Sequence, residues 1–174
     1  MTFRPACRRR LSRPRNPTKL GEAYDNQETG LADSLAIELD NELAEIERFE
    51  GEFQAFAARH GLAARTIGQI WLAFDELLTN TISYGFPEGG QHRISVRLDI
   101  AGDCLTTELV DDGVAFDPLA APEPDLDSAL EERDIGGLGI HFVRVVMDSV
   151  DYRREKDQNR LLMTKRILPP PQQD

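Results

Sequence analysis

The chain has 174 residues, of which 40% are hydrophobic and 29% charged, as expected of a single globular domain. No apolar run approaches the ~18 residues that a membrane-spanning helix needs, and the basic start lacks the apolar stretch of a secretory signal. Residues 1–20 carry seven Lys or Arg and no acid; because the whole chain has a net charge of −11, residues 21–174 carry −18. A domain this acidic repels the phosphates of nucleic acids, so we expect no nucleic-acid binding. The lack of a long apolar run predicts no membrane binding.

The two ends of the chain differ in composition from its middle. Residues 1–32 are Arg-rich and then polar, with no hydrophobic period, which predicts a disordered N-terminal extension. A basic tail that touches nucleic acid or another protein is the alternative. The Pro-rich residues 169–174 are expected to be a flexible tail. Cys7 and Cys104 lie far apart with neither a disulfide framework nor zinc spacing, which favours a reducing cytoplasm.

The first half of the domain predicts a strand and two helices. The run 35–40 alternates as a strand does, and Asn41 stands where a helix N-cap would. A helical pattern follows and stops at His60-Gly61, and a second helix is expected over about 64–83. Its apolar residues recur at 3.6 spacing and form one stripe: Ile67, Ile70, Trp71, Phe74 and Leu78.

The second half adds strands and one more helix, expected over about 137–149. The strand-like runs are 92–100, 104–110, 150–155 and 159–167. The first two form a β-hairpin with Ile94, Val96 and Leu98 on one face. This mixture predicts an α+β fold, a two-layer sandwich with a mostly antiparallel sheet and its helices packed on one face.

Two polar side chains on the second helix could carry chemistry. Glu76 and Asn80 are four residues apart and share a face roughly opposite the apolar stripe. A carboxylate can accept a hydroxyl proton, and an amide oxygen one turn on is a hard ligand for Mg²⁺. Taken alone, the pair is better explained as the polar face of an amphipathic helix.

Three further features lie downstream of that helix. Asp111-Asp112-Gly113 follows a strand and is either a plain turn or an adenine-reading carboxylate beside a close-approach glycine. Gly136-Gly137-Leu138-Gly139 opens a helix whose amides could face phosphate, although glycine clusters are also common in plain loops. Between them, residues 114–135 are Pro-rich without clear secondary structure, which predicts a lid over a ligand.

In this order, the motifs resemble the GHKL (Bergerat-fold) ATPase superfamily, and within it the RsbW-like anti-sigma-factor serine kinases. The matching stretches are FDELLTNTISYGF, VDDGVAFDP, GGLGIHFVRVVMDSVDY and NRLLMTKRI, and the resemblance covers about residues 35–168. The domain is accordingly taken as residues 33–168. The sequence departs from many relatives at Tyr84, where they have His, and at Asn159-Arg160, where sensor kinases have Gly-Thr.

The resemblance implies a role for each site residue. Glu76 would be the general base, Asn80 the magnesium ligand and Asp111 the adenine reader, with Gly113 beneath the ring. The triphosphate would be bordered by Gly137, Leu138 and Gly139, with Arg133 of the lid near the γ-phosphate.

The implied activity is that of a cytoplasmic protein serine/threonine kinase that uses ATP and Mg²⁺. Its implied partners are a STAS-domain antagonist of an anti-sigma factor, a sigma factor or another regulator, and a second copy of the chain. One alternative is a nucleotide-gated binding module with little or no kinase activity. Another is a detached histidine-kinase catalytic domain, disfavoured because no phosphoacceptor helix pair precedes the domain and because His60, His92 and His141 read as structural.

Overall fold

The computed structural model describes residues 33–120 and 138–167. The predicted N-terminal extension, the C-terminal tail and lid residues 121–135 therefore lie outside the described residues. The elements follow in the order β1 (Asp33–Asp40), α1 (Ala44–Arg59), α2 (Ala64–Tyr84), β2 (Arg93–Ala101), β3 (Cys104–Asp111), α3 (Leu138–Val146), β4 (Ser149–Glu155) and β5 (Gln158–Arg166).

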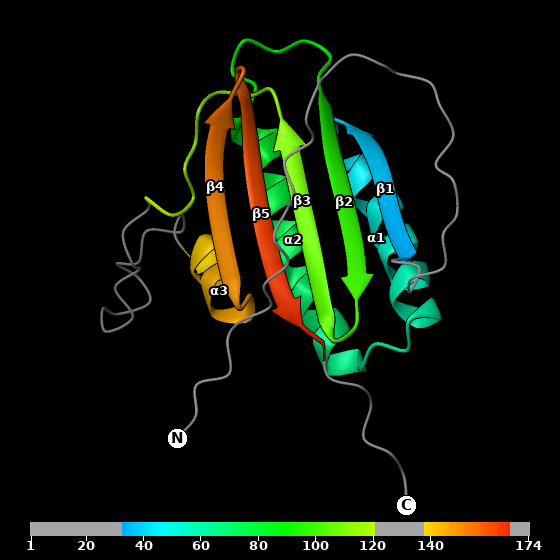
Figure 1. Cartoon of the computed structure of the whole chain (residues 1–174). Coiled ribbons are helices and arrows are strands. Elements are labelled where there is room, and N and C mark those ends of the chain that lie inside the picture. Colours follow the sequence, from blue (N-terminus) through cyan, green and yellow to red (C-terminus); the bar gives the residue numbers. More distant parts are fainter. Residues whose placement is uncertain (1–32, 121–137, 168–174) are drawn as a thin grey trace, which may run out of the picture.

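The five strands form one antiparallel sheet in the order β1-β2-β3-β5-β4. Figure 1 shows the three helices on one face of this sheet. The predicted two-layer α+β sandwich is confirmed.

The core lies between the helices and the sheet. The predicted stripe of α2 faces it: Ile70, Phe74 and Leu78 are fully buried, and Ile67 and Trp71 pack against them. Phe74 meets the α1 rings Phe49 and Phe53 edge to face, with centroids 5.0 and 5.4 Å away. From the sheet, the predicted face of Ile94, Val96 and Leu98 is fully buried. This packing fixes how α2 is rotated, and so which of its side chains face away from the core.

Two sequence predictions of helix ends were wrong. Asn41 does not cap α1; its amide donates to the Gly90 carbonyl and its carbonyl accepts from the His92 backbone, which extends the β1–β2 pairing by one residue. An Asn side chain can satisfy strand-end backbone groups as well as helix ends. The third helix ends at Val146, and Ser149 already begins β4, because the Asp148 backbone joins the sheet through Thr164.

The hairpin turns follow from local chemistry. Gly102, between β2 and β3, has a φ of 61°, a conformation that glycine adopts without strain. Between β4 and β5, Lys156 and Asp157 both have positive φ, as a two-residue type I′ turn requires. Beside the β4–β5 turn, the β3–β5 pairing brings Asp111 opposite Asn159, 48 residues away in the chain.

No helix within residues 33–120 and 138–167 is long and apolar enough to span a membrane. Cys104 is buried at the start of β3. The other cysteine, Cys7, lies outside the described residues.

Candidate functional site

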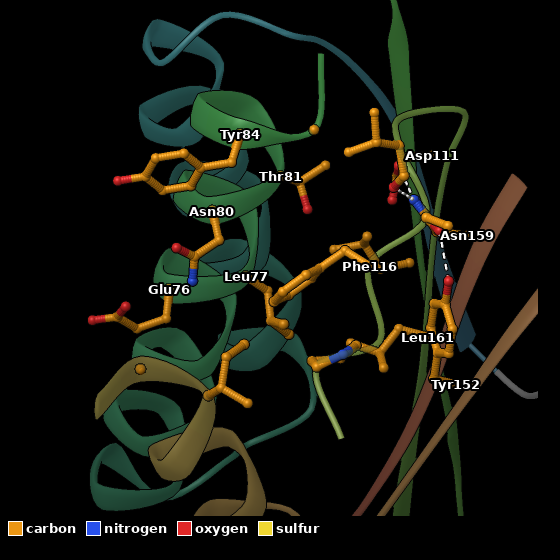
Figure 2. Close-up of a pocket in the computed structure, with 17 residues that line it drawn as sticks. Glu76, Leu77, Asn80, Thr81, Tyr84, Asp111, Phe116, Tyr152, Asn159 and Leu161 are labelled. Atoms are coloured by element: carbon orange, nitrogen blue, oxygen red, sulfur yellow. Dashed lines mark hydrogen bonds between the residues drawn. The ribbon is translucent and has the colours of Figure 1, made fainter. Parts of the chain in front are cut away.

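A cavity of 420 Å³ lies between α2, the end of β3 and the β4–β5 hairpin, with the start of α3 at one side. Its walls include Glu76 and Asn80 of α2, Asp111 of β3, Gly139 of α3 and Asn159 of β5. Figure 2 shows Glu76 and Asn80 on one side of the cavity and Asp111 and Asn159 on the other, with Phe116 between them. The fold thus brings together four residues that the sequence predicted as one site: Glu76, Asn80, Asp111 and Gly139. Its size is that of a small-ligand pocket.

On the α2 side, the cavity wall is a polar helical stripe with Leu77 beside it. Glu76 and Asn80 are one turn apart, and Thr81 and Tyr84 continue the wall toward the end of the helix. The stripe faces the cavity because the opposite stripe is held in the core. Tyr84, where many relatives have His, is 74% exposed.

On the sheet side, Asp111 is the buried carboxylate. Its Oδ1 accepts hydrogen bonds from Asn159 Nδ2 at 2.7 Å and from the Gly113 backbone at 2.9 Å. Burial raises the pKa of Asp111, and these hydrogen bonds together with the Arg154 charge only partly offset that effect. The neighbouring Asp112 is instead exposed and pairs with His92 Nδ1. Of the two adjacent acids, only Asp111 lines the cavity.

Gly113 does not line the cavity, but the turn requires it. A Cβ at this position would lie 2.7 Å from the Gly85 carbonyl oxygen and 2.9 Å from Asp111 Oδ1. Because the nearest obstacle is backbone, it cannot swing aside. The close approach that the sequence predicted for Gly113 is therefore made to Gly85, at the end of α2. The next residues, Val114, Ala115 and Phe116, supply the adjoining cavity wall.

The first turn of α3 touches the α2 wall. Gly139 lines the cavity, and a Cβ there would lie 2.5 Å from Cδ and 2.9 Å from Cγ of Glu76. Leu138 begins α3, whereas Gly137 and Arg133 lie outside the described residues. Farther along α3, Arg144 donates to the carbonyl oxygens of Pro118 and Leu119, which ties the start of the predicted lid to this helix.

The cavity residues that sequence reasoning did not assign to the site include Asn159, Tyr152 and Phe116. In the sequence, Asn159 stands out only as a departure from a Gly-Thr pair. Its position opposite Asp111 comes from the strand order and the β3–β5 register, which no local pattern encodes.

A metal would find few protein ligands here. The parts of the chain that the structure describes hold no group of three or more His, Cys, Asp or Glu side chains able to cage an ion. Mg²⁺ commonly takes one or two protein oxygens and completes its shell with water and substrate phosphates. The Asn80 amide oxygen, with Glu76 one turn away, fits such a nucleotide-borne ion.

The family described as "Histidine kinase-like ATPase domain" matches residues 39–165, which include every cavity residue named above. The chain belongs to this family. Membership in the histidine kinase-like ATPase family implies the use of ATP.

Curated relatives carry kinase and anti-sigma names. The chain is 30% identical over 113 residues to serine/threonine-protein kinase BtrW of Bordetella bronchiseptica, covering 65% of this chain and 80% of that protein. It is 28% identical to serine-protein kinase RsbW of Listeria monocytogenes, covering 64% and 73%. It is 30% identical to the anti-sigma F factor of a Thermoanaerobacter species, covering 65% and 79%.

Among solved structures, the chain is similar to a Mycobacterium tuberculosis protein composed of RsbU and RsbW domains. The TM-score is 0.56 at 17% identity, and the match covers 79% of this chain and 33% of that one. This likeness shows the fold, and the chain spans about a third of that larger protein.

Proposed function

We propose that this protein is an ATP-dependent serine/threonine kinase of the anti-sigma-factor type. The observation that carries the proposal is a single cavity with a buried carboxylate on one side and a Glu/Asn pair beside a helix N-terminus on the other. The kinase names of relatives covering about two thirds of the chain support it.

The sheet side suits a purine base. Asp111 is 5% exposed and can accept from the exocyclic amino group of adenine, while the apolar side chains of Leu77, Leu109 and Leu161 offer surface to the ring. A hydrogen bond to an ionised group in a buried site is stronger than one between neutral groups. This combination favours adenine as the bound base.

The α2 side suits a triphosphate and an attacking hydroxyl. In the proposed reaction, the hydroxyl oxygen of a partner Ser or Thr attacks the γ-phosphorus, the bond to the β–γ bridging oxygen breaks, and ADP leaves. Glu76 takes the hydroxyl proton. Mg²⁺, held through Asn80, would neutralise phosphate charge. Because α3 begins at Leu138 and Gly139 lines the cavity, the N-terminal turn of this helix would favour anionic groups there.

The partners and location belong to the same proposal. The acceptor is a STAS-domain antagonist protein, and the chain also binds a sigma factor or another regulator, consistent with the name of the anti-sigma F relative. The functional unit is a homodimer. Because ATP is the substrate, the expected location is the cytoplasm.

Phosphate transfer tests the proposal directly. The purified chain is incubated with Mg²⁺ and γ-labelled ATP together with STAS proteins from the same organism, and ATP affinity is measured in parallel. Glu76→Gln keeps the side-chain shape but cannot take the proton, so transfer should fall ~10²–10⁴-fold with ATP affinity little changed. Asn80→Ala should weaken Mg-ATP binding and transfer together.

Asp75→Asn is the matched control, since Asp75 neighbours Glu76, carries the same charge and does not line the cavity. It should leave both measurements near wild type. Near wild-type transfer by Glu76→Gln would show that this carboxylate is not the base. ATP binding by wild type without transfer to any STAS protein would reject the kinase and favour the nucleotide-gated binding module.

A further inference from the structure

Asn159 is a buried amide at the centre of a hydrogen-bond network on the sheet side of the cavity, where the adenine is proposed to bind. It is 8% exposed, and its Nδ2 donates to Asp111 Oδ1 at 2.7 Å and to the Val114 carbonyl at 3.0 Å. Its Oδ1 accepts from Tyr152 Oη at 2.8 Å and from Arg154 Nη1 at 2.9 Å. A primary amide has two N–H donors and one oxygen with two lone pairs, so the side chain is fully used. The partners also fix the amide orientation, because Arg154 can only donate and the Val114 carbonyl can only accept.

This network orients the Asp111 carboxylate. Oδ1 is occupied by Asn159 and by the Gly113 backbone, whereas Oδ2 accepts no hydrogen bond from the described residues. The remaining oxygen is therefore the one free to meet a ligand. An exocyclic amino group, as on adenine, can donate to it, while guanine carries a carbonyl oxygen at the equivalent position and would be repelled.

The same network also holds the backbone that follows Asp111. Arg154 Nη1 donates to the Gly113 carbonyl at 2.7 Å, and the Val114 N–H donates to the Gly85 carbonyl at 2.8 Å. With Asn159 on the Val114 carbonyl, the turn is tied to the β4–β5 hairpin on one side and to the end of α2 on the other. The carboxylate therefore has little freedom to reorient when the base changes.

We propose that Asn159, supported by Tyr152 and Arg154, is a positioning residue that sets the selectivity of this site for ATP over GTP. It acts through Asp111 and touches no reacting atom. The inference rests on the proposed function only in that the bound nucleotide is ATP; it does not depend on transfer to a protein.

The test measures the affinities of Mg-ATP and Mg-GTP by calorimetry on the full chain, with a thermal melt of each variant. Asn159→Ala should weaken ATP binding about 10-fold and change GTP binding little, so the ATP/GTP preference shrinks by a similar factor. In the transfer assay, KM for ATP should rise while kcat at saturating ATP stays within about threefold. Tyr152→Phe removes one supporting bond, and should give the same pattern at about threefold without loss of the fold.

Asn159→Asp gives a readout that a purely structural role would not produce. The new carboxylate faces Asp111 and the Val114 carbonyl, which are both acceptors, with Arg154 and Asp112 as the nearby charges. One oxygen then needs a proton, so ATP affinity should be weakest at about pH 8 and recover toward pH 6. The ATP affinity of Asn159→Ala should show no such recovery.

Gln158→Ala is the matched control: it removes an amide from the adjacent β5 position, which faces away from the cavity. It should leave both affinities unchanged. Equal loss of ATP and GTP in Asn159→Ala, or no loss of either, would overturn the positioning role. If wild type binds no ATP, the proposed function fails instead, so the two failures are distinguishable.

Discussion

Replacing Gly139 by Ala should disable the proposed kinase while leaving the fold intact. The added methyl would lie 2.5 Å from Cδ and 2.9 Å from Cγ of Glu76, far inside van der Waals contact. The obstacle is the end of a flexible side chain, so Glu76 must leave its present rotamer. Such a shift costs about 0.5–1.5 kcal/mol.

A second effect has the opposite sign. Gly139 lies in α3, and Ala is favoured over Gly within a helix by roughly 0.5–1 kcal/mol. The two terms nearly cancel, so the melting temperature should change by no more than a few degrees. Transfer should instead fall by ~10²–10⁴-fold, since the displaced carboxylate is the proposed base.

Differential scanning fluorimetry and the labelled-phosphate assay measure the two quantities on the same samples. The matched control is Gly68→Ala, a helical glycine of α2 with open space where the added methyl would lie, which should retain full transfer. Wild-type transfer by Gly139→Ala would refute the reasoning, because it would mean that Glu76 can move without consequence. A large drop in melting temperature would refute the cancellation of the two terms.

Two further predictions concern stability. Burial raises the folded-state pKa of Asp111, so the protonated side chain stabilises the fold at low pH and this stabilisation is lost as pH rises through that pKa. Asp111→Asn should therefore melt at a higher temperature than wild type at about pH 8. The difference in melting temperature should be smaller near pH ~4. The same variant should bind ATP ~10–100-fold more weakly by titration with a fluorescent analogue. Asn41→Ala should cost about 1–2 kcal/mol in denaturant unfolding, through the lost bonds to Gly90 and His92, with ATP affinity within about twofold. No stability loss would make that Asn dispensable, and unchanged ATP binding by Asp111→Asn would reduce Asp111-Asp112-Gly113 to a turn.

The sequence predicted the fold well because each element carries its own local signal. The α2 stripe, the β2 alternation and the Gly102 turn can all be recognised within a short window. The errors came where a local signal had two meanings. Asn41 is an equally good helix cap or strand-end partner, and only the neighbouring β2 strand decides between them.

The site divides in the same way. Glu76, Asn80, Asp111 and Gly139 belong to motifs that can be recognised along the chain, and the fold brings them to one cavity. Asn159 could not be recognised from a motif, because its role depends on which strand pairs with β3 and in what register. In the sequence, Asn159 is noticed only because Asn159-Arg160 replaces the Gly-Thr pair of sensor kinases. In the fold, the Asn159 amide forms hydrogen bonds with four groups.

Different kinds of interaction hold the two ends of the cavity. This difference limits where the protein could distinguish ATP from ADP. On the sheet side, where the adenine is proposed to bind, hydrogen bonds from β4, from β5 and from the end of α2 hold Asp111 and the turn that follows it. At the other end, Glu76 and Gly139 meet by packing between two helices. ATP and ADP share the same base, so a fixed carboxylate contributes equally to both. Within the part of the chain that the structure describes, we therefore expect a response to the γ-phosphate where α2 meets α3, because Glu76 and Gly139 meet there beside the cavity.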